Sequence, residues 1–247
     1  MRKLFALIMI SAYSIPTHAQ GYWSQVPAAP TGCYSEKDDF TKKLDASREL
    51  LKKATTEKED AMRKQAENMT QEQKMKIATQ YQSMSPDEIR KMQSEQSELA
   101  TIQQATGTKG SEVETRFNEL ESAYNDDIKS KLGPVTAEAA KLPDGEGTPD
   151  WAIQKGKELM LKYNAEYEAI CAKYFTGNGA LFAAWLADYK KYLTETEVPF
   201  THRSVEIQYK ILGITPDPDL PEMEAVAKYM DRMRTVYGMR HSLPQGE

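Results

Sequence analysis

Apolar side chains recur at helical spacing along most of this chain, and this periodicity restricts the fold more than any other feature. In the clearest run, apolar residues three or four positions apart share one face of a helix: Val113, Phe117, Leu120, Tyr124, Ile128 and Leu132. Gly133-Pro134 then predicts the end of this helix. Strict alternation of apolar and polar residues, the pattern of a half-buried strand, is almost absent. The sequence therefore predicts an all-α protein.

Residues 141–150 divide the predicted helices into two groups. This segment contains two prolines and two glycines, a composition typical of a linker. Residues 35–140 are rich in Lys, Glu and Gln and carry only a thin apolar stripe, which suits a long helical hairpin or a coiled-coil-like arm. We expect the turn of that hairpin at the glycines of residues 107–110. Residues 151–238 hold most of the aromatic residues and predict a helical bundle with a denser core, followed by a flexible tail at 239–247.

Two helix starts are marked by capping residues. Thr70 precedes Gln73 by three positions, and Ser85 precedes Glu88 by the same spacing. In such a capping box each side chain bonds to the main chain of the other residue, so that two unpaired N–H groups are satisfied. Pro86 strengthens the second start, because the first helical position needs no N–H donor. These patterns predict helices that begin near residues 71 and 86.

The first 19 residues have the pattern of a secretory signal peptide. Two basic residues precede an unbroken apolar run at residues 4–10, and small residues at Thr17 and Ala19 suit a cleavage site. A retained membrane anchor is the alternative, but the run is shorter than the about 20 residues that span a bilayer. We expect export to the periplasm or the extracellular space, with no stable membrane insertion after cleavage.

Export makes Cys33 and Cys171, the two cysteines of the chain, candidates for a disulfide. The bond would close a loop between positions 138 residues apart and fix the N-terminal segment to a helix of the second half. Two free buried thiols and a redox pair are the alternatives, although no Cys-x-x-Cys motif supports the latter.

The composition and the missing motifs argue against several functional classes. The net charge of -5 disfavours non-specific nucleic-acid binding, which depends on Lys and Arg. After signal cleavage only His202 and His241 remain as histidines, and no Gly-x-Ser-x-Gly elbow occurs, so we assign no catalytic residue. No Glu-x-x-His pair or glycine-rich phosphate loop is present, and we therefore predict no metal site and no cofactor.

A small hydrolase or lytic enzyme remains the alternative from a different class. Helical hydrolases can place two carboxylates beside aromatic sugar platforms. The candidate carboxylates are Glu158, Glu166 and Glu168, and the nearby aromatic residues are Tyr163, Tyr167, Trp185 and Tyr189. Lysines alternate with these acids, however, which is typical of the solvated side of an amphipathic helix.

Two groups of residues are candidates for binding a partner. Tyr22 and Trp23 belong to a proline-containing arm at residues 20–34, which we expect to be extended, with these two rings either packed on the body or exposed. Methionine surfaces adapt to varied apolar ligands, and one stretch is rich in this residue, at Met69, Met75, Met84 and Met92. The alternative is that these methionines fill gaps between helices.

In overall plan, an exported chain with a Lys/Glu/Gln-rich helical hairpin resembles the periplasmic holdase chaperones of outer-membrane proteins. No motif is shared, and this chain is acidic where those chaperones carry basic arms, so the resemblance implies no functional residue. We therefore expect an exported, non-enzymatic protein that binds a protein partner, as a chaperone-like or envelope-assembly module. A purely structural role in an envelope assembly and self-association both stay open.

Overall fold

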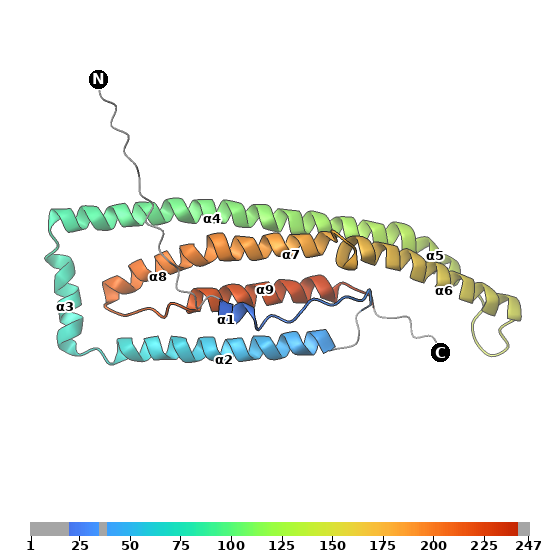
Figure 1. The fold of residues 1–247 in the computed structure, drawn as a ribbon, viewed down its shortest axis with the longest axis horizontal. Helices are drawn as coiled ribbons and strands as arrows, with labels where there is room; N and C mark the ends of the chain where they lie inside the picture. Colours follow the sequence, from blue (N-terminus) through green and yellow to red (C-terminus); the bar gives the residue numbers. More distant parts are fainter. Residues whose placement is uncertain (1–19, 35–38, 242–247) are drawn as a thin grey trace, which may run out of the picture.

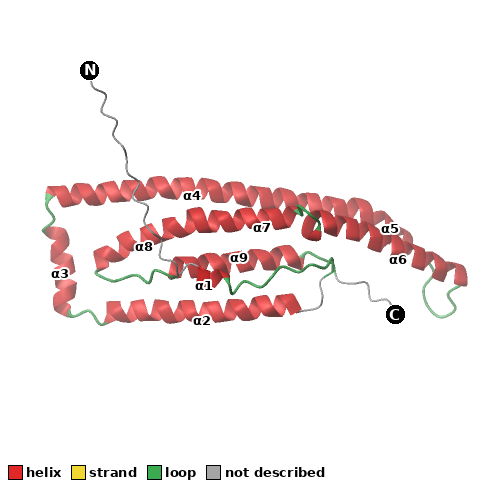
Figure 2. Ribbon diagram, in the orientation of Figure 1, coloured by secondary structure: helices red, strands yellow, loops and turns green. Residues whose placement is uncertain are grey.

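The computed structural model describes residues 20–34 and 39–241, and within these ranges the chain is helical with no strand (Figure 2). The predicted all-α class is confirmed. The predicted signal peptide at 1–19 and the last part of the predicted tail, 242–247, lie outside the described residues. The helices are α1 Gln20–Trp23, α2 Asp39–Glu67, α3 Gln71–Gln82, α4 Pro86–Asp127, α5 Gly133–Ala139, α6 Asp150–Cys171, α7 Leu181–Tyr192, α8 Val198–Leu212 and α9 Leu220–Gly238.

Helices α2, α3 and α4 form an open bracket around the C-terminal helices (Figure 1). α2 and α4 run along opposite long edges of the molecule, and α3 crosses between them at one end. α2 packs mainly on α9, whereas α4 packs on α7 and α8. α2 and α4 therefore bury their thin apolar stripes against the aromatic-rich helices that lie between them.

The turn that we expect at residues 107–110 does not form, because α4 continues through it as one helix of 42 residues. A glycine inside a helix costs only about 1 kcal/mol relative to Ala, which the packing of a long helix can offset. Gly110 also has a tertiary reason to be glycine. A Cβ atom there would lie 2.7 Å from the Tyr192 hydroxyl oxygen, so the residue marks a close approach of α7 to α4.

Gly133-Pro134 does not end the helical rod as predicted. A π-helical turn, Ile128–Leu132, connects α4 directly to α5, and Pro134 lies in the first turn of α5. Proline is tolerated there because that position needs no main-chain hydrogen bond. A second π-helical turn, Leu193–Glu197, connects α7 to α8 in the same way.

The predicted linker forms the connection between α5 and α6. The two helices pack on each other and project beyond the end of α9 as a helical hairpin (Figure 1). Gly145 and Gly147 in this connection have φ values of 116° and 88°, which favour glycine. The residues between α5 and α6 thus serve as the turn of a hairpin whose two helices come from the two predicted halves.

The core is built around aromatic residues of α4, α6 and α7. Trp185 of α7 is fully buried, and its ring lies 4.8 Å from that of Phe117 on α4. The indole N–H donates to the main-chain carbonyl of Val113 at 2.9 Å, so the buried polar group is satisfied. A second group of rings packs around Phe182, with Tyr124, Tyr174 and Phe175 as neighbours. The dense aromatic core expected in the second half therefore also includes residues of α4.

The C-terminal residues 239–241, which the sequence places in a flexible tail, lie against the body. Arg240 is buried, and its guanidinium donates to the carbonyls of Gly32 at 2.6 Å and Tyr237 at 3.2 Å. These bonds tie the segment that follows α9 to the N-terminal arm. Across residues 20–34 and 39–241, no helix combines the length and the apolar character needed to cross a bilayer.

Candidate functional site

The four methionines predicted to bind a partner lie in or next to α3 and in the first turns of α4. α3 crosses one end of the molecule (Figure 1). Met69 precedes α3 and Met75 lies within it. Met84 lies just before α4, and Met92 lies within α4. Met75 is 65% exposed, whereas the other three are half-buried. The structure thus divides the set: Met75 faces solvent, and the other three are partly covered.

Both corners of α3 are fixed by the predicted capping boxes, which are confirmed. At the first corner the Thr70 N–H donates to the Gln73 side chain at 2.8 Å, and the Gln73 N–H returns a bond to the Thr70 hydroxyl at 3.1 Å. At the second, the Ser85 N–H donates to the Glu88 carboxylate at 2.8 Å. This main-chain bond, followed by one from the Ser85 hydroxyl, lowers the pKa of Glu88 below its usual range. Local bonds, and not packing, therefore set the start of α3 and the start of α4.

α3 makes little contact with the rest of the protein. None of its described side chains is fully buried, and only Ile77 is half-buried. Ile77 reaches the connection between α8 and α9, where its Cδ1 lies 3.7 Å from the position of a Cβ atom at Gly213. The outer face of α3 is therefore free of intramolecular cover among the described residues.

A surface cavity of about 320 Å³ lies between α4, α8 and the connection from α8 to α9. Ile207, Ile214 and Pro216 supply its apolar lining, and Arg203 and Glu206 its charged lining. Arg203 lies 3.5 Å from the carboxylate of Glu206. Glu95 of α4 is a third charged residue of the lining. The apolar part of the cavity can accept an apolar side chain.

The rings of Tyr22 and Trp23 pack on the body, which is one of the two arrangements expected for them. The Trp23 ring lies 5.5 Å from that of Tyr229 on α9, edge to face, and the Lys190 amino group lies over the Trp23 ring at 4.5 Å. α1 is a short helix at the start of the predicted extended arm. Both rings are half-buried, so the arm is attached to α9 and α7 and does not extend into solvent.

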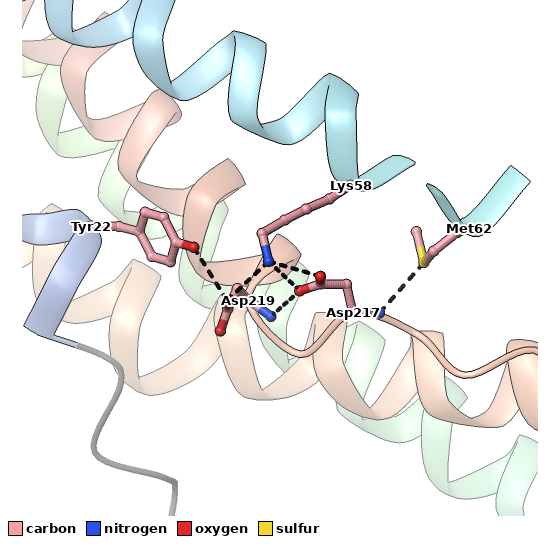
Figure 3. A network of polar contacts seen from close by, with 5 residues as sticks. All are labelled: Tyr22, Lys58, Met62, Asp217 and Asp219. Atoms are coloured by element: carbon pink, nitrogen blue, oxygen red, sulfur yellow. Dashed lines mark hydrogen bonds and ion pairs between the residues drawn. The ribbon is translucent and has the colours of Figure 1, made fainter. Parts of the chain in front are cut away.

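A polar network holds α1, α2 and the start of α9 together (Figure 3). The Lys58 amino group donates to both oxygens of Asp217, at 2.9 and 2.7 Å, and to Asp219 at 3.0 Å. The Tyr22 hydroxyl donates to the same Asp219 carboxylate at 3.2 Å. Burial alone would lower the pKa of Lys58, but its bonds to Asp217 and Asp219 outweigh burial and raise it. Lys58 therefore stays charged between the two carboxylates.

Cys33 and Cys171 are free thiols in the structure, and the predicted disulfide is not formed there. The fold nevertheless brings them together. The Thr176 hydroxyl lies 3.6 Å from the Cys33 sulfur and 3.8 Å from the Cys171 sulfur. Burial, followed by a hydrogen bond with Cys33, raises the pKa of Cys171 to about 12.

The aromatic residues of the alternative hydrolase site belong to the core. Tyr167 and Trp185 are fully buried, and Tyr189 stacks on Trp185 with ring centres 5.1 Å apart. Of the candidate carboxylates, Glu166 is half-buried and Glu158 is exposed beside Lys155. None of these residues lines the cavity near α3 or a second cavity of about 400 Å³ between α2 and α9.

His202 and His241 have separate environments. Burial lowers the pKa of His202 on α8 and that of His241 beyond α9. His241 stacks on Tyr167 at 4.5 Å, and its Nδ1 lies 2.8 Å from the Tyr163 hydroxyl. Within residues 20–34 and 39–241 no cluster of His, Cys, Asp and Glu side chains is arranged to hold a metal ion.

Sequence reasoning missed the network of Lys58 and the contacts of Arg240 and His241. The sequence pattern predicted only a proline-containing turn at Asp217 and Asp219, and a flexible tail after Gly238. Their partners are distant in sequence, so no local spacing could have indicated them.

Comparisons of the chain with protein-family models, with curated proteins and with solved structures find no match.

Proposed function

We propose that this protein is an exported, non-enzymatic binding module that contacts a protein partner through the end of the bundle closed by α3. The observation that carries the proposal is the exposed face of α3, on which Met75 points to solvent while the helix buries almost none of its own surface. A 12-residue helix is marginal on its own in water. The capping box at Thr70 fixes its start without covering that face.

The charge of this end suits a protein partner. Residues 68–92 contain four basic and three acidic side chains, in a chain whose net charge is -5. A nearly balanced set of charges around an exposed apolar group does not repel a partner of either charge. The nearby cavity, lined by Ile207 and Ile214, offers a place for an apolar side chain of the partner.

Methionine is a suitable residue at such a surface, because its unbranched side chain adapts to differently shaped apolar groups. Met69 and Met84 are half-buried at the two corners, and Met92 is half-buried in the second turn of α4. Tyr22 and Trp23, in contrast, already have partners within the chain. These contacts favour α3 over the N-terminal arm as the surface for a partner.

Export is the second part of the proposal and depends on the pattern of residues 1–19. An oxidising compartment would also favour the disulfide between Cys33 and Cys171. Mass analysis of the protein from fractionated cells tests export directly. We expect a chain that begins at Gln20 in the exported fraction, and a full-length chain that stays in the cytosol would contradict this part.

Point variants test the binding surface better than truncation, since removing residues before 145 would strip α2 and α4 from the core. We propose Met75→Asp, with Leu50→Asp on α2 as its matched control. The two side chains are 65% and 67% exposed, so both changes put a charge in place of an equally exposed apolar group. Both variants are expected to fold, as judged by circular dichroism and thermal unfolding.

The readout is affinity capture from envelope extracts, followed by a binding isotherm with each captured protein. We expect Met75→Asp to weaken binding by about tenfold or more, the loss expected for a residue at the centre of an interface. Leu50→Asp should bind as the unchanged chain does. Equal binding by all three proteins, or loss only in Leu50→Asp, would overturn the assignment of the surface to α3.

A further inference from the structure

The end of the N-terminal arm is held on α6 by contacts that orient its main chain. The Tyr167 hydroxyl donates to the Cys33 carbonyl at 3.1 Å, and Arg240 donates to the Gly32 carbonyl at 2.6 Å. The Tyr34 ring packs on Tyr167 with ring centres 5.2 Å apart. Because residues on both sides of Cys33 are fixed, the position of its side chain is set by the fold.

The partner thiol is placed by the end of α6. Cys171 is the last residue of this helix, and a π-helical turn, Ala172–Thr176, follows it. The turn ends with a bond from the Gly177 N–H to the Ala172 carbonyl at 2.7 Å, and a Cβ atom at Gly177 would lie 2.3 Å from that oxygen. Only glycine fits this approach, which puts the Thr176 hydroxyl beside Cys171 and Cys33 at once.

The two thiols meet although their positions in the chain are 138 residues apart. Cys171 is completely buried and Cys33 is half-buried, and the Thr176 hydroxyl lies within 3.8 Å of both sulfurs. A reagent from solvent can therefore reach Cys33 but not Cys171. This order suits a thiol pair that reacts in two steps.

We propose that Cys33 and Cys171 are a modification site, at which a disulfide-containing oxidant converts the two thiols into a bond that locks the arm onto α6. The Cys33 thiolate attacks a sulfur of the oxidant, which forms a mixed disulfide and releases the first thiol of the oxidant. Cys171 then loses its proton and attacks the Cys33 sulfur, which releases the second thiol. The two cysteines are oxidised, the disulfide of the oxidant is reduced, and the two cysteine protons end on the two product thiols.

The bond would secure both chain ends at one place. The His241 N–H donates to the Tyr167 hydroxyl at 2.6 Å, and this hydroxyl in turn bonds to Cys33. A covalent link at Cys33 therefore holds the arm, α6 and the segment after α9 in one cluster. Without it, the arm depends on the hydrogen bonds and ring contacts described above. This inference rests on the proposed export, because an exported protein meets disulfide oxidants.

The second step sets the expected kinetics. The attacking group is a thiolate, and burial keeps Cys171 protonated well above neutral pH. The mixed disulfide on Cys33 should therefore accumulate before the internal bond forms. Its conversion should speed up by about tenfold for each pH unit between 7 and 9, as the thiolate fraction of Cys171 rises.

The test uses the purified chain from Gln20 to Glu247, reduced and then exposed to oxidised glutathione. Free thiols are counted, the remaining ones are alkylated, and unreduced proteolytic fragments are identified by mass spectrometry. We expect the thiol count to fall from two to zero, with a linked peptide that contains Cys33 and Cys171. The midpoint of thermal unfolding should rise by about 10 °C on oxidation, because the bond restricts a long loop in the unfolded chain.

Cys33→Ser is the control, and its thermal midpoint should equal that of the reduced unchanged chain. Glutathione adducts or chain-to-chain dimers without the linked peptide would overturn the proposal, as would two thiols that stay free. A linked peptide without a rise in the midpoint would overturn the locking role. Because α3 closes the opposite end of the bundle (Figure 1), partner capture by Met75 variants tests the binding surface separately.

Discussion

The hydroxyl oxygen of Tyr192 lies 2.7 Å from the place that a Cβ atom would occupy at Gly110, in the middle of α4. Gly107, one turn earlier in the same helix, has no atom within 4 Å of its Cβ position. Two glycines of one helix therefore carry opposite tertiary constraints. Gly110 keeps α7 close to α4, whereas Gly107 costs the helix stability without a compensating contact.

This contrast predicts opposite effects for one substitution. Gly107→Ala should stabilise the protein by about 0.5–1 kcal/mol, because Ala is a better helix former and nothing obstructs its methyl group. Gly110→Ala should lose that gain and cost about 1 kcal/mol, since its methyl group would displace Tyr192. Urea unfolding of both variants checks the prediction. Equal stabilisation by both would contradict the close approach, and adding Tyr192→Ala to Gly110→Ala should relieve the clash.

Lys58→Met should destabilise the protein by about 1 kcal/mol at pH 7, because Asp217 and Asp219 would face each other without the shared cation. The matched control is Lys43→Met in the same helix. Lys43 pairs with Asp39, but both side chains are largely exposed, and such pairs contribute little. Chemical unfolding in low salt measures both changes. A loss in Lys43→Met as large as that in Lys58→Met would show that helix propensity, and not the network, is responsible.

Trp185→Phe should cost about 2–3 kcal/mol, because it removes buried volume and the hydrogen bond from the indole N–H to the Val113 carbonyl. Trp151→Phe on α6 offers the same chemical change at a site that is 61% exposed, and we expect almost no loss there. Thermal unfolding followed by circular dichroism compares the two. A comparable loss of stability in Trp151→Phe would contradict this prediction, and would mean that Trp151 is buried by contact with another molecule.

Stability should fall as the pH drops from 7 to 5.5, partly through His241. Burial lowers the pKa of this histidine, so the folded chain binds a proton less readily than the unfolded chain does. Its contribution is therefore complete above the unfolded pKa of about 6.5 and is lost as the pH falls toward the folded value.

His241→Phe keeps a ring on Tyr167 but cannot titrate. The free energy of unfolding of this variant should depend less steeply on pH between 7 and 5.5 than that of the unchanged chain. His202→Phe removes the other histidine whose pKa burial lowers, and the double variant should have the flattest profile. An unchanged slope in His241→Phe would mean that His241 titrates alike in the folded and unfolded chains.

Interactions over a few residues could be predicted from the sequence. The all-α class follows from apolar periodicity, and the capping boxes at Thr70 and Ser85 involve partners only three positions away. The candidate methionines were also recognisable as a group, because they lie close together along the chain. Their different exposures were not, since burial depends on which neighbouring helix packs beside each residue.

The sequence by itself determined that this chain is helical and where α3 and α4 begin, because short-range hydrogen bonds and spacing control those features. Only the tertiary structure decided that residues 107–110 stay helical and that the N-terminal hairpin opens around α7, α8 and α9. Packing energy from many residues outweighs the preference of two glycines for a turn. The same long-range packing brings Cys33 to Cys171, a proximity that no local pattern encodes.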